Sequence, residues 1–179
     1  MEIKSYSGMK KIVITGPESS GKTTLFEQLT KAYKVFGVNE YAREYICDLK
    51  REYNYQDILE IAKVQFEKEE NAFNSNQQFL ITDTDLLTLE IWCEFKYGKS
   101  HKFITDNLRN HLPDLYLLCC PDMPWEYDPL RENPNDRLEL FNIYKTKILS
   151  LGVKYLVLKG DMLNRLENSK RLINKTFNS

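Results

Sequence analysis

The sequence predicts an α/β fold in which a parallel sheet is flanked by helices, and three observations lead to this prediction. Short apolar runs of strand length alternate along the chain with longer segments of helical periodicity. A glycine-containing loop stands between the first of these strands and the first helix. With 179 residues, of which 42% are hydrophobic and 28% charged, the chain is long enough for one compact core and too short for two ordinary domains.

Five strands are expected to form one buried sheet, at residues 11–15, 34–38, 79–82, 115–120 and 154–158. Helices are expected around them, at residues 23–32, 41–50, 56–75, 85–97, 101–110, 137–150 and 161–175. The helix over 56–75 has the clearest pattern, because Ile58, Ile61 and Phe66 share one stripe opposite charged residues. Gln65 lies beside that stripe, either as a buried polar group or half in water.

The chain is expected to consist of a flexible N-terminal lead over residues 1–9 and a single domain over residues 10–179. The lead is polar and lacks the apolar segment of a secretory signal, and no run of residues is apolar enough to span a membrane. We therefore expect a cytoplasmic protein without a membrane partner. The formal net charge of -1 provides no basic face for nucleic acid, so nucleotide-sized ligands are favoured. The oligomeric state does not follow from the sequence.

The loop after the first strand fits the phosphate-binding pattern G-x-x-x-x-G-K-[ST]. It reads Gly16-Pro17-Glu18-Ser19-Ser20-Gly21-Lys22-Thr23 and continues into Thr24. Gly16 and Gly21 let the backbone turn so that successive N–H groups point inward, and the helix that follows adds the partial positive charge of its N-terminus. Lys22 is expected at the β- and γ-phosphates of ATP, and Thr23 at a Mg²⁺ ion. Strand, loop and helix in this order predict the fold of a P-loop NTPase.

Acidic residues follow the strands at the edge where parallel sheets bind ligands. The apolar third strand ends at Asp83, which we predict on the metal side of the site, opposite Thr23. Asp85 lies two residues further on, and strand-like spacing would point both carboxylates into one cleft. It is a candidate for the acceptor hydroxyl and equally a candidate N-cap of the next helix. Glu40 and Glu44 compete with Asp85 for the role of general base.

The segment over residues 128–137 is rich in turn formers and is expected to form a mobile lid. Closing such a lid excludes water and brings cationic groups onto a transferring phosphoryl group. Arg131 and Arg137 are therefore predicted to stabilise that group, with exposed loop charges as the alternative. A nucleoside kinase with a lid is the type of protein that these features favour.

Substrate contacts are predicted for one basic and two aromatic residues. Arg43 would hold phosphate or substrate oxygens, unless it forms a solvated helical pair with its acidic neighbour. Trp125 and Tyr127, at the start of the lid, would stack on an aromatic base or merely anchor the loop. Trp92 is expected in the core.

The chain resembles the NadR-type nicotinamide riboside kinase domain over residues 11 to about 170, and four segments in a fixed order carry this resemblance. They are the loop, Glu40-Tyr41-Ala42-Arg43-Glu44-Tyr45, Asp83-Thr84-Asp85, and the run from Pro124-Trp125 to Asp128-Pro129-Leu130-Arg131. The resemblance implies ATP-dependent phosphorylation of the ribose 5′-hydroxyl of nicotinamide riboside, which yields nicotinamide mononucleotide for NAD biosynthesis. It also implies that Trp125 lies near the nicotinamide ring. Family lids often read Asp-Gly-x-Arg, whereas here Pro129 replaces the flexible glycine.

Two further interpretations remain open. One is a regulatory switch that binds and slowly hydrolyses ATP while acting on a protein partner; the paired acids and the lid argue against it. The other is a kinase of a different nucleoside, which would share every feature except the base pocket. A GTPase is disfavoured, because no Asn-Lys-x-Asp segment and no Asp-x-x-Gly segment follow the expected strands.

Overall fold

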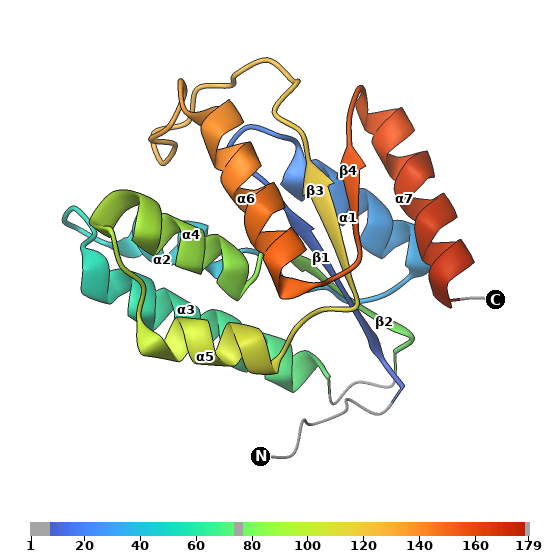
Figure 1. Ribbon diagram of the computed structural model, residues 1–179, viewed down its shortest axis with the longest axis horizontal. Helices are drawn as coiled ribbons and strands as arrows, with labels where there is room; N and C mark the ends of the chain where they lie inside the picture. The colour runs from blue at the N-terminus through green and yellow to red at the C-terminus, as the bar shows by residue number, and fades with distance from the viewer. Residues whose placement is uncertain (1–7, 74–76, 178–179) are drawn as a thin grey trace.

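A parallel sheet forms the centre of the computed structural model, which describes residues 8–73 and 77–177 (Figure 1). Its strand order is β2-β1-β3-β4. The strands are β1 (Lys10–Thr15), β2 (Phe79–Asp83), β3 (Leu115–Cys119) and β4 (Tyr155–Leu158). Ile12 of β1 pairs with Ile81 on one side and with Leu115 on the other. Residues 1–7 of the expected N-terminal lead lie outside the described residues.

Helices cover both faces of the sheet, because alternate residues of each strand point to opposite faces. Ile12 and Ile14 point toward α1 (Lys22–Tyr33) and α7 (Met162–Phe177). Val13 belongs to the opposite core, which packs against the remaining helices. These are α2 (Tyr41–Asp48), α3 (Tyr55–Ala72), α4 (Leu86–Tyr97), α5 (Lys102–Asn110) and α6 (Arg137–Leu151). The predicted α/β layering is confirmed.

The prediction of a fifth strand over residues 34–38 is wrong, since only Val38 pairs with the sheet. It forms a single bridge to Thr82, in which Val38 N donates to Ile81 O at 3.0 Å. Lys34 has φ 55° and turns the chain sharply at the end of α1. Gly37 then passes so close to Phe26 that a Cβ would lie 2.4 Å from its ring. The chain therefore reaches the edge of β2 at one residue only.

Helix ends follow local capping signals. The side chain of Asn54 accepts from the backbone of α3 and forms a capping box with Asp57, so α3 begins one residue earlier than predicted. Asp85 caps α4, as one of its two predicted roles requires. The helix expected to reach residue 50 ends at Asp48, because Leu49 has an extended backbone.

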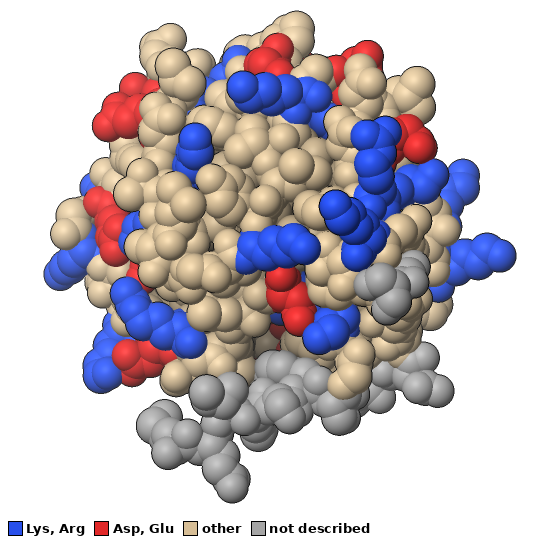
Figure 2. All heavy atoms as spheres, turned by 45° about the vertical axis from the view of Figure 1, so that its right-hand side comes forward, with Lys and Arg blue, Asp and Glu red and all other residues tan. Residues whose placement is uncertain are grey.

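Charged side chains of both signs are dispersed over the surface. Figure 2 shows one face, on which lysines and arginines lie among uncharged residues with acids beside many of them. Within the described ranges, every helix is too short or too polar to cross a lipid bilayer.

Candidate active site

The loop between β1 and α1 has the backbone that its glycines predict. Gly16 has φ 136° and Gly21 has φ 77°, in the region that favours glycine. A Cβ on Gly16 would lie 2.6 Å from Cys119 O, so the loop can pass this close to β3 only without a side chain. Ser20 Oγ donates to Pro17 O at 2.7 Å and closes the loop on itself. Lys22 Nζ also donates to Pro17 O, at 2.8 Å, which folds the lysine back over the loop.

Thr23 and Asp83 meet where the loop faces the end of β2. Thr23 Oγ1 donates to Asp83 Oδ2 at 2.7 Å. The other carboxylate oxygen, Asp83 Oδ1, is buried and has no hydrogen-bond partner among the described residues. Burial raises the pKa of Asp83, while the positive charge of Lys22 opposes this shift. A buried carboxylate oxygen without a partner is suited to a hard cation such as Mg²⁺.

The described residues contain no cluster of three or more His, Cys, Asp or Glu side chains that would hold a metal by themselves. Mg²⁺ usually binds through one or two protein oxygens, with phosphates and water completing its shell. Thr23 and Asp83 therefore fit Mg²⁺ bound together with a nucleotide rather than a dedicated structural metal.

One cavity of about 370 Å³ joins the loop to the helices on the α4 side of the sheet. This volume is within the usual range of small-molecule sites. Every residue of the loop from Gly16 to Thr24 lines its first half. The second half is lined mainly by α2, α4 and α6, with Glu40, Arg43, Ile46, Thr88, Ile91, Trp92, Phe95, Leu140 and Tyr144. The cavity therefore connects the phosphate-binding loop with the helices α2, α4 and α6.

Glu40, the N-cap residue of α2, lines this cavity with its carboxylate. Burial raises its pKa, and the negative charge of Asp83 adds to the shift, whereas Lys22 and Arg43 oppose it. Glu44, the other candidate on this segment, is exposed and pairs with Lys68 at 3.2 Å. Of these two acids, only Glu40 can meet a ligand in the cavity.

Neither Asp83 nor Asp85 is among the cavity-lining residues. Asp83 reaches the loop through Thr23, whereas Asp85 binds Tyr116 instead, which corrects the expectation that both carboxylates point into one cleft. Thr84 has φ 66°, so the backbone leaves the strand conformation and the two carboxylates no longer alternate as in a strand. Asp85 is 1% exposed, accepts from Tyr116 Oη at 2.8 Å and caps α4 through Leu87 N at 3.1 Å. Burial raises its pKa to about 6, against the attraction of Lys11.

The segment predicted as a lid contacts the loop. Glu18 accepts from the backbone N–H of Glu132 at 3.2 Å and of Asn133 at 2.9 Å. Ser19 Oγ accepts from Glu126 N at 2.9 Å. Arg131 lines the cavity and donates to Glu126 O at 2.5 Å. The loop thus holds the lid through its own side chains.

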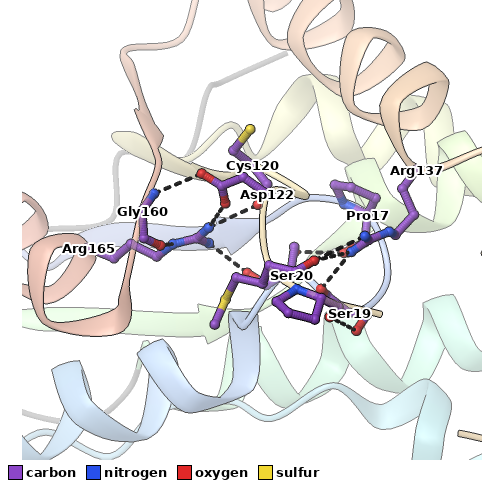
Figure 3. A network of polar contacts seen from close by, with 10 residues as sticks. Pro17, Ser19, Ser20, Cys120, Asp122, Arg137, Gly160 and Arg165 are labelled. Atoms are coloured by element: carbon purple, nitrogen blue, oxygen red, sulfur yellow. Dashed lines mark hydrogen bonds and ion pairs between the residues drawn. The ribbon is translucent and has the colours of Figure 1, made fainter. Parts of the chain in front are cut away.

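Arg137 has a different position from Arg131. Its guanidinium donates to Ser19 O at 3.0 Å and to Met123 O at 3.1 Å, and it is not among the cavity-lining residues (Figure 3). Trp125 lies beside both arginines, with its ring centroid 6.0 Å from Arg131 Cζ and 5.7 Å from Arg137 Cζ. Arg137 therefore binds the backbone of the loop and of Met123, which precedes the predicted lid.

Trp125 and Tyr127 do not line the cavity, and Tyr127 is 86% exposed. The aromatic walls come instead from Trp92 and Phe95, one turn apart on α4, and from Tyr144 on α6. Trp92, expected in the core, is half-buried between that core and the cavity. Their spacing resembles that of core residues, so periodicity alone could not assign them to a ligand.

The lid is also tied to the helices of the second half. Arg43 Nη2 donates to Asp128 at 2.8 Å. Lys96 of α4 pairs with Glu132 at 3.1 Å, and Tyr53 Oη donates to the same carboxylate at 2.6 Å. Arg43 thus faces both the cavity and the lid.

Gln65 is buried, and it connects the second half to the core. Its Oε1 accepts from Tyr41 N at 3.0 Å, next to Glu40, and its Nε2 donates to Glu69 at 3.2 Å. Lys11 completes the chain with a 2.6 Å contact to Glu69. This network fixes the backbone from which Glu40 projects.

Comparison with known families assigns most of the chain to one family. Residues 11–165 match a family described as an AAA domain. The chain belongs to this AAA domain family. The match includes the loop, Asp83 and the lid, and it ends at Arg165 of α7.

Two curated relatives of this AAA domain are trifunctional NAD biosynthesis/regulator proteins named NadR. The protein of Escherichia coli is 27% identical over 150 residues, which are 79% of this chain and 36% of the relative. That of Salmonella typhimurium is 26% identical over 136 residues, 73% of this chain and 32% of the relative. The chain thus spans only 32% to 36% of the length of these relatives. The predicted resemblance to NadR is confirmed.

Solved structures share the fold of this AAA domain. A NadR protein in complex with NR has a TM-score of 0.79 at 20% identity, over 97% of this chain and 52% of that one. A deoxyadenosine kinase from M. mycoides has a TM-score of 0.64 at 16% identity, over 92% of this chain and 99% of that one. The fold is therefore that of P-loop nucleoside kinases, with a sheet of four strands.

Proposed function

We propose that this protein is an ATP-dependent kinase that phosphorylates the ribose 5′-hydroxyl of nicotinamide riboside and yields nicotinamide mononucleotide. The observation that carries the proposal is a cavity that joins a phosphate-binding loop to an aromatic-walled half containing Glu40. A switch that only hydrolyses ATP has no need of this second half. The NadR relatives in NAD biosynthesis and the NadR structure in complex with NR support nicotinamide riboside as the acceptor.

The donor phosphates would bind to the N–H groups of the loop from Gly16 to Thr24 and to Lys22. The lysine now donates to Pro17 O and would exchange that carbonyl for phosphate oxygens. Thr23 and Asp83 would hold Mg²⁺, which supplies charge neutralisation of the phosphate oxygens when bound. A NadR structure in complex with NAD and AMP-PNP supports an adenine nucleotide as the donor.

The acceptor would lie with its ring against Trp92 and Phe95 and its ribose toward Glu40. The 5′-oxygen forms the new bond to the γ-phosphorus, and the bond from that phosphorus to the bridging oxygen of ADP breaks. The hydroxyl proton passes to the carboxylate of Glu40, whose raised pKa suits it to accept a proton. Arg43 and Arg131, both in the cavity lining, would stabilise the transferred charge. Trp125 and Tyr127 would contribute by holding the lid.

Incubation with Mg-ATP and a panel of ribosides tests this function. Nicotinamide riboside should raise ADP release and give a product heavier by one phosphoryl group, whereas other nucleosides should react more slowly. The Lys22→Ala variant should lose at least about 100-fold in turnover with an unchanged circular dichroism spectrum, since it removes a preorganised cation from the phosphates. ADP release that responds to a protein partner and to no riboside would show a switch instead.

A further inference from the structure

Arg165 of α7 is completely buried at 0% exposure and lies outside the lining of the cavity. Its guanidinium nevertheless binds the ends of three segments that surround the site, as Figure 3 shows. Nε donates to Gly160 O at 2.9 Å after β4, and Nη2 donates to Cys120 O at 3.0 Å after β3. Nη1 donates to Ser20 O of the phosphate-binding loop at 2.7 Å.

Among the described residues, Asp122 is the one carboxylate that pairs with this buried cation. Asp122 accepts from Arg165 Nη2 and also from Gly160 N, the latter at 2.8 Å. The other acceptors are main-chain carbonyls, so most of the hydrogen bonds of the guanidinium hold the backbone of these three segments in place. Simple packing would be served as well by an apolar side chain, because a buried charge must be compensated before it stabilises a fold. The fork geometry of arginine suits this task, since its five N–H donors have fixed directions.

The contact with Ser20 O determines where the next amide points. In a trans peptide the carbonyl and the N–H lie on opposite sides of the same plane, and the described residues contain no cis peptide. Arg165 holds Ser20 O from outside the cavity, so the N–H of Gly21 in that plane points away from Arg165. Gly21 lines the cavity, so an N–H that points away from Arg165 can be directed at a ligand there.

We propose that Arg165 is a positioning residue for donor binding: it fixes the Ser20–Gly21 peptide so that the Gly21 N–H is directed at the phosphates of the bound nucleotide. This inference rests on the proposed function only in requiring that the loop binds phosphates. Arg165 acts through the loop and touches no ligand itself. Its effect therefore falls on phosphate affinity and not on the acceptor.

Binding of inorganic tripolyphosphate and of ATP, measured by titration calorimetry, tests the proposal without depending on catalysis. Arg165→Met removes the fork, and Arg165→Lys keeps the charge but not the planar geometry. Ile173→Ala is the matched control, since Ile173 is also fully buried on α7 and belongs to the core cluster of that face. Both Arg165 variants should bind tripolyphosphate and ATP about tenfold more weakly, as for a lost hydrogen bond to a charged group. Ile173→Ala should lower the melting temperature and keep the affinity.

Turnover gives a second readout that loss of stability alone would not move. The KM for ATP should rise about tenfold in Arg165→Lys, whereas the KM for the acceptor should remain that of the wild type. If Arg165→Met does not fold, Arg165→Lys carries the test. Wild-type affinity for tripolyphosphate in a folded Arg165 variant would overturn the positioning role and leave the kinase proposal intact. A wild-type protein that binds neither probe would overturn the proposed function itself.

Discussion

Thr23 Oγ1 donates a 2.7 Å hydrogen bond to Asp83 Oδ2, which links the first turn of α1 to the end of β2. The second oxygen of Asp83 remains buried without a partner among the described residues. A buried acceptor in this state costs free energy unless a ligand satisfies it. In the proposed function, this pair would receive a cation that arrives with the nucleotide.

Asp83→Asn should raise the Mg²⁺ concentration needed for half-maximal turnover by about 10- to 100-fold, because an amide oxygen carries no net charge to attract the ion. Titration of MgCl₂ at fixed ATP measures the shift. Thr23→Ser is the matched control, since it keeps the hydroxyl that donates to Asp83. An unchanged Mg²⁺ requirement in Asp83→Asn would place the ion elsewhere.

Glu40→Gln should lower kcat by about 100-fold, because the amide cannot accept the hydroxyl proton. The acid limb of the wild-type pH–rate profile should lie above pH 4.5, the ordinary pKa of a glutamate, since burial raises the pKa of Glu40. The variant should also melt at a higher temperature than the wild type at pH 7. Above pH 4.5 the raised pKa of Glu40 opposes folding, because the folded protein binds the proton more tightly than the unfolded chain does. This gain should vanish below pH 4, where the carboxyl is protonated in both states.

Asp85→Asn should retain most of the wild-type turnover, because Asp85 lies outside the cavity and asparagine is also a good N-cap. Asp85→Ala should lose about 2 kcal/mol of stability, from the lost cap and the orphaned hydroxyl of Tyr116. With the folded pKa raised from 3.8 to about 6, the contribution of Asp85 to stability falls as pH rises through that interval. Melting curves between pH 4 and pH 7 should show a smaller fall in melting temperature with rising pH for Asp85→Asn than for the wild type. A loss of turnover in Asp85→Asn as large as that of Glu40→Gln would return Asp85 to the list of candidate bases.

Glu18→Ala should loosen the lid, since both carboxylate oxygens of Glu18 accept lid N–H groups. Hydrogen exchange at the amides of Glu132 and Asn133 should become faster, and trypsin should cut after Arg131 more readily. Glu139→Ala removes an equal charge from an exposed position of α6 and should change neither. If exchange at these amides is the same in both variants, the contacts with Glu18 do not close the lid.

The donor half of the site was predictable from sequence because it is local. Glycine positions, the lysine and the hydroxyl follow one another within a single loop, and Asp83 ends an apolar strand. The acceptor half was not predictable, because Trp92 and Phe95 repeat with the same spacing as core residues and only tertiary packing decides which face a cavity. Asp85 was misplaced through one backbone angle, the left-handed φ of Thr84, which no spacing rule anticipates. The five-strand prediction failed for a comparable reason, the close passage of Gly37 over Phe26.

The contacts that shut the lid join protein to protein and need no bound molecule. In the proposed kinase, a turnover would therefore begin with the opening of these contacts. Both admission of substrates and escape of products then require rupture of the bonds from Glu18, Arg43 and Lys96. We expect solvent viscosity and salt, which act on such an opening step, to influence the rate of the whole cycle.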